Sequence, residues 1–229
     1  SEPSAILRNE YIKKYLNSEI VNFTLKEYRL VNYLSEKFLS SIRSIILKEI
    51  SKNKNKNESY EYLTPFLLSL SKQSYMNDYC WFQSKSEDEL VNKIYSNIIE
   101  KFRSNIKVEM YEILIVNSYK SLFDLKDINE YLLNNFMNSE ISDLIELQIT
   151  NRIKEEELGK KIENIARIKD KTSLAVKKQY EQNPYPRWEK LSNIIFKDYK
   201  LLVSHLISPN KIAYNNKEDN ISIKNILIA

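Results

Sequence analysis

Glycine is almost missing from this chain of 229 residues, in which Gly159 is the only one. Average usage of about 7% would give roughly 16 glycines in a chain of this length. Glycine provides the positive-φ conformations that let a loop approach a phosphate or a nucleotide cofactor closely. Because the chain cannot build a glycine-rich turn, its sequence argues against a cofactor-binding loop within these residues.

Apolar residues recur every three or four positions along most of the chain, which is the spacing of amphipathic helices. The longest such pattern predicts one continuous helix over residues 25–50, and another predicts a helix over residues 4–16. Ser86 and Glu89 have the spacing of a capping box, which predicts the start of a helix over residues 87–102. Other helices are expected over residues 62–79, with a break near Asn77 and Asp78, and over 108–117, 127–136, 139–150 and 155–165.

The C-terminal end differs from the rest of the chain. After a polar break at residues 215–220, apolar and β-branched residues crowd together at Ile221, Ile223, Ile226, Leu227 and Ile228. Such a run predicts a short β-strand, of the kind found in parallel sheets that are covered on both faces. No fixed repeat period holds for three copies. The sequence therefore predicts a mainly α-helical protein, an irregular multi-helix array that ends in one short β-strand.

Composition excludes several classes of protein. The net charge of +4 comes from 35 basic and 31 acidic residues spread along the chain, so no nucleic-acid partner is expected. A single cysteine, Cys80, allows neither an intramolecular disulfide nor a thiolate metal site, and its aromatic neighbours predict a buried, inert thiol. No window approaches the roughly 18 apolar residues of a membrane span, and no secretory leader is recognisable. We expect a cytoplasmic protein without a metal and without a membrane partner.

Residues 179–188 read QYEQNPYPRW, and two prolines dominate their physics. Pro184 and Pro186 fix φ and push Asn183 and Tyr185 toward extended conformations, while Pro186 also suits the first turn of a helix expected over residues 187–206. Aromatic side chains around Arg187 could bind a planar or anionic partner, and they could equally pack between two domains and hold them together. Both interpretations stay open on the sequence alone.

This segment closely resembles QYEENPYPRW, the signature of a bacterial family that couples an N-terminal helical region to a class I S-adenosylmethionine-dependent methyltransferase domain. Some members of that family carry tetratricopeptide repeats further upstream. Gln182 stands where glutamate is usual. Two other segments resemble the family, LSLSKQSYMNDYCWFQSKSEDEL at residues 68–90 and the terminal ILIA. In the family, that tetrapeptide ends the first strand and is followed by the glycine-rich turn that receives S-adenosylmethionine.

The resemblance, which covers residues 63–229 and is loose before them, implies the N-terminal helical part of a methyltransferase. It implies a helical domain (1–178), a signature linker with a connecting helix (179–220) and the first strand of a truncated Rossmann-like methyltransferase domain (221–229). The full-length protein would bind S-adenosylmethionine, whereas this chain would bind no cofactor, contain no catalytic residue and be inactive alone. Its partners would be the missing methyltransferase domain and a protein or peptide substrate.

Three residues, Tyr180, Tyr185 and Arg187, are the candidates for lining the cofactor site of the full-length protein. They belong to the signature, whose matching positions are Gln179, Tyr180, Glu181, Asn183, Pro184, Tyr185, Pro186, Arg187 and Trp188. The alternative function is a free-standing helical module for protein–protein interaction, and an unpaired apolar strand at its end argues against it. A third possibility is a fragment cut by design or proteolysis at the junction of the two domains.

Overall fold

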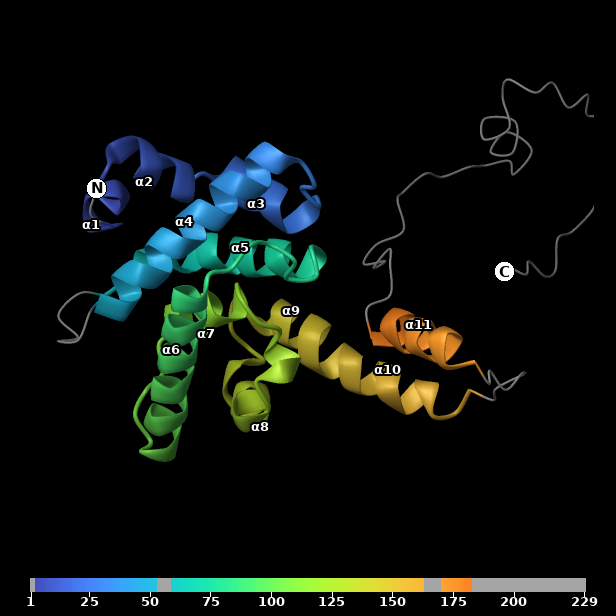
Figure 1. Ribbon diagram of the computed structural model, residues 1–229. Coiled ribbons are helices and arrows are strands. Elements are labelled where there is room, and N and C mark those ends of the chain that lie inside the picture. Colours follow the sequence, from blue (N-terminus) through green and yellow to red (C-terminus); the bar gives the residue numbers. More distant parts are fainter. Residues whose placement is uncertain (1–2, 53–58, 163–169, 183–229) are drawn as a thin grey trace, which may run out of the picture. The chain divides into compact units, whose positions relative to one another are not determined.

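Helices form the secondary structure of residues 3–52, 59–162 and 170–182, which are the residues that the computed structural model describes (Figure 1). These residues contain no strand, so the expectation of a mainly α-helical protein is confirmed for them. They belong to the first of two units of the chain, Ser1–Pro184. The strand predicted over residues 221–229 and the helix predicted over 187–206 lie outside the described residues.

The elements follow one another with short connections. Eleven α-helices alternate with the 3₁₀ turns η1 and η2 and with the π-helical turn η3 in the described residues. Their bounds are α1 Pro3–Leu7, α2 Glu10–Leu16, α3 Glu19–Glu27, α4 Tyr33–Lys52, η1 Glu61–Leu63, α5 Thr64–Met76, α6 Lys85–Arg103, α7 Met110–Asn117, η2 Leu122–Asp124, α8 Lys126–Phe136, α9 Ser142–Ile145, η3 Glu146–Thr150, α10 Asn151–Gly159 and α11 Lys171–Gln182.

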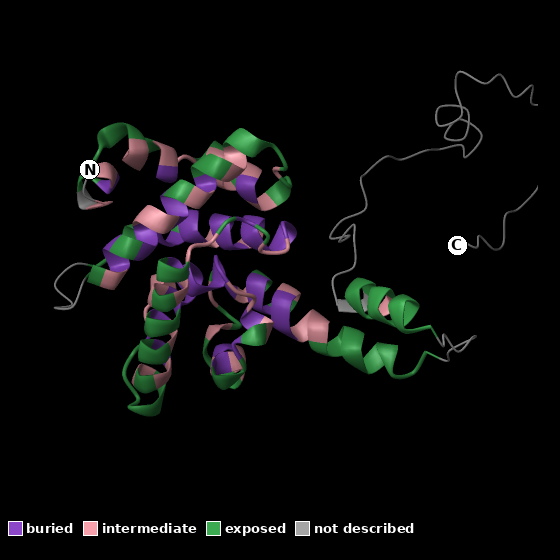
Figure 2. Ribbon diagram, viewed as in Figure 1, coloured by how far each residue is buried: buried purple, intermediate pink, exposed green. Residues whose placement is uncertain are grey.

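Helix α5 is the central element, and it packs against both α3 and α7 (Figure 1). Its buried residues surround the whole helix, so it lacks the exposed polar face of a surface helix (Figure 2). Ser69, Ser71 and Ser74 are fully buried, and their small side chains allow neighbouring helices to approach closely. Ser71 also donates a hydrogen bond to the Leu114 carbonyl of α7, at 2.9 Å. Helices α4 and α6 pack against each other and against α7 around this centre.

The single helix predicted over residues 25–50 is wrong, because the chain leaves helix α3 after Glu27 and starts α4 at Tyr33. The cause is Gln73 of α5, which is fully buried. Its Nε2 donates to the carbonyls of Leu25 and Tyr28, at 3.0 and 2.8 Å, and its Oε1 accepts from the Leu30 amide, at 2.9 Å. Backbone groups that would continue the helix are therefore satisfied by a side chain from another element.

Other boundaries differ from the prediction for similar local reasons. The helix expected over residues 4–16 is two helices, because Asn9 accepts hydrogen bonds from the amides of Tyr11 and Ile12 and caps α2. The capping box of α6 is formed by Ser84 and Glu87, two residues before the predicted pair. The helices expected over 139–150 and 155–165 form one helical run, α9–η3–α10, which ends at Gly159. The break predicted near Asn77 and Asp78 is confirmed, since α5 ends at Met76.

Replacing Gln73 by methionine tests the side chain that separates α3 from α4. Methionine has a similar volume but no comparable hydrogen-bonding groups, so the carbonyls of Leu25 and Tyr28 and the amide of Leu30 lose their partner. We expect the free energy of unfolding, measured by urea denaturation, to fall by about 2–3 kcal/mol. The same change at the exposed Gln179 of α11 is the control, with an expected effect within about 0.5 kcal/mol. Equal effects at both positions would contradict this role of Gln73.

Candidate functional site

The signature begins on helix α11, and the described residues contain only its first four positions. The helix starts after Asp170, whose carboxylate accepts a hydrogen bond from the Ser173 amide at 2.8 Å. Gln179 and Tyr180 are exposed on it, with 62% of Tyr180 accessible to solvent. Glu181 lies in the same helix. The other signature positions lie outside the described residues: Asn183, Pro184, Tyr185, Pro186, Arg187 and Trp188. Of the three candidate cofactor-lining residues, only Tyr180 is therefore described.

The second segment that resembles the methyltransferase family, residues 68–90, forms most of α5, the turn after it and the start of α6. Several of its polar residues, among them Ser71, Gln73 and Asn77, are buried and form hydrogen bonds within the helical core. Asn77 donates through Nδ2 to the carbonyl and to the Oε1 atom of Gln73, at 3.0 and 2.8 Å, and so orients the Gln73 amide. Arg29 donates to Oδ1 of Asn77 at 3.4 Å. These residues hold helices together rather than face an open site.

The turn after α5 contains two consecutive residues with positive φ, Asp78 at 51° and Tyr79 at 54°. This conformation costs a residue with a side chain roughly 1–2 kcal/mol, and it is unusual for an aromatic one. Tyr79 is held there by its amide, which donates to the Ser74 carbonyl at 2.9 Å. Cys80 follows and is exposed, so the prediction of a buried thiol was wrong. Aromatic neighbours in the sequence do not bury a residue on a sharp turn.

Gln148, on the π-helical turn η3, joins this turn to the C-terminal helices. Its Oε1 accepts hydrogen bonds from the Tyr79 hydroxyl at 3.1 Å, from Asn117 Nδ2 at 2.8 Å and from the Leu122 amide at 2.9 Å. Gln148 and Asn117 are both buried. Single-turn π-helices often occur at functional sites, but here the widened turn carries a side chain that satisfies buried groups on η2, α7 and the turn after α5.

Arg43 of α4 is the largest fully buried side chain among the described residues, with 1% of its surface exposed. Its guanidinium donates to the Ser118 carbonyl at 2.9 Å and to the Phe82 carbonyl at 3.0 Å. It also stacks on the Tyr119 ring, 3.9 Å from the centroid. Burial lowers the pKa of Arg43, an effect that Tyr119 and Glu87 partly oppose. Nothing in the sequence distinguishes this arginine from a surface arginine, and the sequence-based prediction missed it.

Glu87 completes this buried cluster from the first turn of α6. Its carboxylate accepts hydrogen bonds from the Tyr119 hydroxyl at 2.9 Å and from the amide and hydroxyl of Ser84, both at 2.8 Å. Burial alone would raise the pKa of Glu87, but the hydrogen bonds from Ser84 and Tyr119 outweigh burial and lower the pKa. Burial also raises the pKa of Tyr119, so this phenol stays protonated and acts as a donor. The cluster joins α4, the start of α6 and the segment after α7.

The lowered pKa of Glu87 predicts how stability depends on pH. A carboxylate whose pKa is lower in the folded state stabilises that state above its unfolded pKa, and this contribution is lost as the pH falls through the folded pKa. We expect Glu87→Gln to reduce the free energy of unfolding by about 1–3 kcal/mol at neutral pH. The difference from the wild type should be constant above about pH 5.5 and shrink at lower pH.

Chemical denaturation of both proteins between about pH 3 and 7 measures this difference. Glu89→Gln is the matched control, because Glu89 is exposed on the same helix. It should leave stability unchanged within about 0.5 kcal/mol. A difference between wild type and Glu87→Gln that does not depend on pH would contradict the role of the ionised carboxylate.

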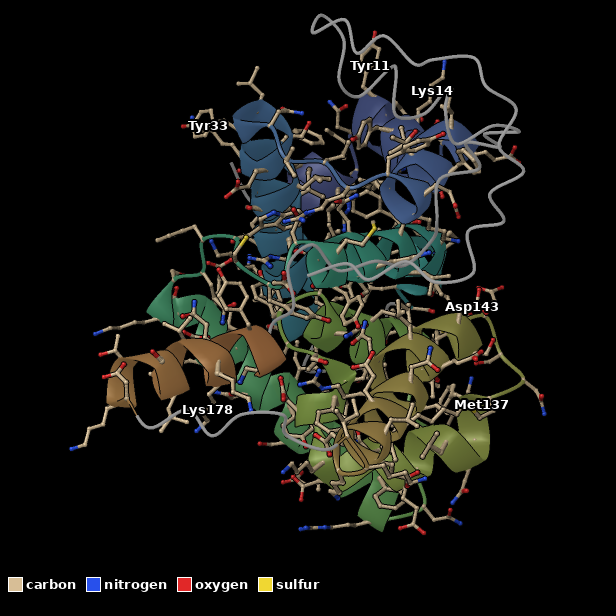
Figure 3. The ribbon with its side chains drawn as sticks, turned by 90° about the vertical axis from the view of Figure 1, so that its right-hand side faces the viewer. Tyr11, Lys14, Tyr33, Met137, Asp143 and Lys178 are labelled. Carbon is tan, nitrogen blue, oxygen red and sulfur yellow. The ribbon has the colours of Figure 1, made fainter. Side chains whose placement is uncertain are left out.

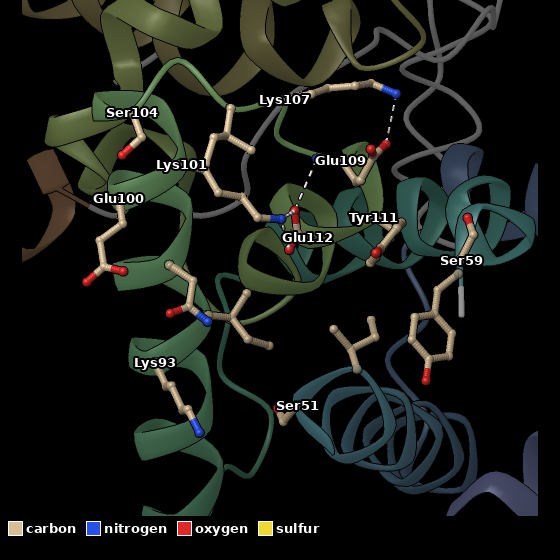
Figure 4. Close-up of a pocket in the computed structure, with 15 residues that line it drawn as sticks. Ser51, Ser59, Lys93, Glu100, Lys101, Ser104, Lys107, Glu109, Tyr111 and Glu112 are labelled. Atoms are coloured by element: carbon tan, nitrogen blue, oxygen red, sulfur yellow. Dashed lines mark hydrogen bonds and ion pairs between the residues drawn. The ribbon is translucent and has the colours of Figure 1, made fainter. Parts of the chain in front are cut away.

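A cleft of about 770 Å³ lies between the end of α4, α6 and the start of α7 (Figure 4). Lys101 and Glu112 form an ion pair in it, with Nζ 2.6 Å from both carboxylate oxygens, and both side chains are mostly buried. Lys107 pairs with Glu109 at 3.1 Å. Each of these two pairs is electrically neutral, so neither gives the cleft a net charge.

The cleft is lined by hydroxyl, amide and charged groups. Burial, helped by the carboxylates of Glu112 and Glu109, raises the pKa of Tyr111 to about 12, so its phenol is neutral near pH 7. The wall includes the polar groups of Ser59, Asn97 and Ser104, which can hydrogen-bond a polar ligand. No nucleophile paired with a base lines it among the described residues, and these residues hold no cluster of three side chains able to bind a metal ion.

Within the described part of the chain, no helix is both long and apolar enough to cross a membrane.

Comparisons of the chain with known protein families, with curated proteins and with solved structures found no match.

Proposed function

We propose that this chain is the N-terminal helical part of an S-adenosylmethionine-dependent methyltransferase, in which it positions a protein or peptide substrate beside a catalytic domain. The observation that carries this proposal is the segment QYEQNPYPRW at residues 179–188, followed by an apolar run that ends in ILIA. The scarcity of glycine also supports a helical part that positions the substrate and a separate domain that binds the cofactor. A chain with one glycine lacks the turn that receives the cofactor, so the cofactor would bind in the catalytic domain.

The described helices support an accessory role in two respects. They form a densely packed unit whose buried polar groups, around Arg43, Gln73 and Gln148, are used for architecture. The cleft beside Lys101 and Glu112 offers hydrogen-bonding groups to a polar ligand and no nucleophile–base pair among the described residues. A unit of this kind is suited to binding and positioning, and chemistry would be supplied by another domain.

Binding of S-adenosylmethionine distinguishes this proposal from its alternatives. We expect isothermal titration calorimetry to detect no binding to the 229-residue chain and clear binding to a chain extended by about 200 residues of its gene, roughly one catalytic domain. Alanine substitution of the glycines in the turn that follows ILIA in the extended chain should abolish binding. Failure of the extended chain to bind would contradict the methyltransferase assignment, and binding by the short chain would contradict the proposed division of labour.

The extended protein also tests the two interpretations of the signature. If Tyr185 and Arg187 line the cofactor site, Tyr185→Ala and Arg187→Ala should each weaken S-adenosylmethionine binding about 10-fold, which corresponds to one lost interaction of about 1.4 kcal/mol. The melting temperature should change little. Lys178→Ala, at an exposed position just before the signature, is the control. Unchanged affinity together with a lower melting temperature would instead identify the signature as a wedge between two domains.

A free-standing module for protein–protein interaction is the second candidate function. A specific observation favours it, namely the number of large apolar side chains that are exposed on α2, α3 and α4, including Tyr11, Ile20, Tyr33 and Leu34. This observation is compatible with both functions, because an accessory domain also needs a surface for a partner. The calorimetric comparison separates the two, since an interaction module predicts no cofactor binding by either chain.

A further inference from the structure

Helix α3, the start of α4 and the connection between them carry a concentrated group of exposed apolar side chains. Six of them lie within 15 consecutive residues and leave between 58% and 75% of their surface in solvent. We call them the α3–α4 patch, which consists of Ile20, Phe23, Tyr28, Val31, Tyr33 and Leu34. Figure 3 shows Tyr33 at the start of α4 extending away from the ribbon. The rings of Phe23 and Tyr28 contact each other edge-on, with centroids 6.4 Å apart.

The area of the patch is that of a protein interface. With roughly 150–200 Å² for a fully exposed large side chain, the observed exposed fractions leave on the order of 700 Å² of surface. The largest apolar patch of a typical monomer covers about 300–600 Å², whereas each partner in a standard interface buries about 800 Å². Ile20 and Phe23 lie one turn apart on α3, Phe23 contacts Tyr28, and only residues 28–32 separate α3 from the start of α4, so the six side chains follow one another along one short stretch of chain.

The patch also has the sequence pattern of a buried surface. Val31 and Leu34 continue the apolar spacing that predicts a single buried stripe along residues 25–50, yet both are exposed, and the fully buried positions of α4 begin at Leu39. Gln73 binds the backbone of Leu25, Tyr28 and Leu30, where the chain leaves α3, and the apolar side chains that follow at Val31 and Leu34 stay exposed. Exposed apolar patches of this size mark sites of protein–protein interaction.

The charges around the patch are compatible with contact between two copies of the same surface. In a two-fold symmetric dimer a surface meets itself, so a strong excess of one charge would be repulsive. Residues 10–38 carry five basic and four acidic side chains, a difference of +1: Lys13, Lys14, Lys26, Arg29 and Lys37 against Glu10, Glu19, Glu27 and Glu36. Both signs alternate along the segment, which permits pairing across a two-fold axis.

We propose that the α3–α4 patch is the interface of a homodimer, in which the patch of one chain covers the patch of a second copy. Burial of about 700 Å² from each chain matches a standard interface, and the aromatic side chains of Phe23, Tyr28 and Tyr33 are of the types enriched in the centres of such interfaces. The Phe23–Tyr28 ring contact already fixes two of these side chains in the free chain. The dimer is independent of the methyltransferase assignment, because it uses neither the signature nor a cofactor.

Sedimentation velocity of the 229-residue chain over a range of concentrations tests the dimer. We expect wild-type protein to sediment as a dimer at about 10 µM, and Leu34→Glu to raise the dissociation constant at least about 100-fold. Two carboxylates would then be buried without partners in one apolar interface, at a cost of about 3 kcal/mol. Because Leu34 is 75% exposed in the first turn of α4, the variant should fold with an unchanged circular dichroism spectrum and melting behaviour of its monomer.

Leu158→Glu on α10 is the matched control, because Leu158 is 59% exposed and lies outside the patch. It should sediment like the wild type. A wild-type chain that stays monomeric up to about 100 µM overturns the proposal, since specific interfaces of this area have micromolar or tighter dissociation constants. Amides at residues 28–34 that become protected from hydrogen exchange only in the extended chain would then assign the patch to the catalytic domain. A dimer that Leu34→Glu leaves intact also overturns the proposal.

Discussion

The buried guanidinium of Arg43 is the interaction on which the packing of the central helices depends. It lies on α4, and it binds the carbonyl of Phe82 before α6 and the carbonyl of Ser118 after α7. Burying a cation is expensive unless it is hydrogen-bonded and its charge is stabilised. Here two carbonyls accept hydrogen bonds from the guanidinium and the rings of Tyr119 and Trp81 lie against it, while the buried Nε has no partner among the described residues. Since the three segments share one cation, none of them can shift without exposing a charge to an apolar environment. Glu87 extends the cluster through Tyr119 and fixes the start of α6 to the same point.

A second constraint comes from the scarcity of glycine. Chains usually end helices and form tight turns with glycine, which adopts positive φ without a steric cost. The described residues instead adopt positive φ at Asp78, Tyr79 and Asn105. The turn at Tyr79 is held by hydrogen bonds to Ser74, Asn117 and Gln148, and the break after α3 is held by Gln73. Buried amide side chains therefore perform the task that glycine performs elsewhere, and they connect distant elements while doing so.

The use of buried side chains from distant elements in place of glycine explains how much of the structure could be predicted from the sequence. Periodicity alone indicated the class of the described residues and the approximate positions of α5, α6, α7 and α8, because an apolar stripe is a local property of the chain. It failed between α3 and α4, where Gln73, more than 40 residues away, binds the backbone of Leu25, Tyr28 and Leu30. The burial of Arg43 and the exposure of Cys80 were equally beyond a local pattern, since both depend on how separate helices meet. Of the predicted site, Tyr180 is described and exposed, whereas Tyr185 and Arg187 remain sequence predictions.

The two internal segments that resemble the methyltransferase family do not support a function equally. In residues 68–90 the side chains of Gln73, Asn77 and Trp81 are buried, so packing explains their identity. Residues whose identity is explained by packing say little about chemistry. The proposal of a methyltransferase therefore rests on the sequence of residues 179–188, of which Tyr180 is exposed on α11, and that segment is where experiments on function should begin.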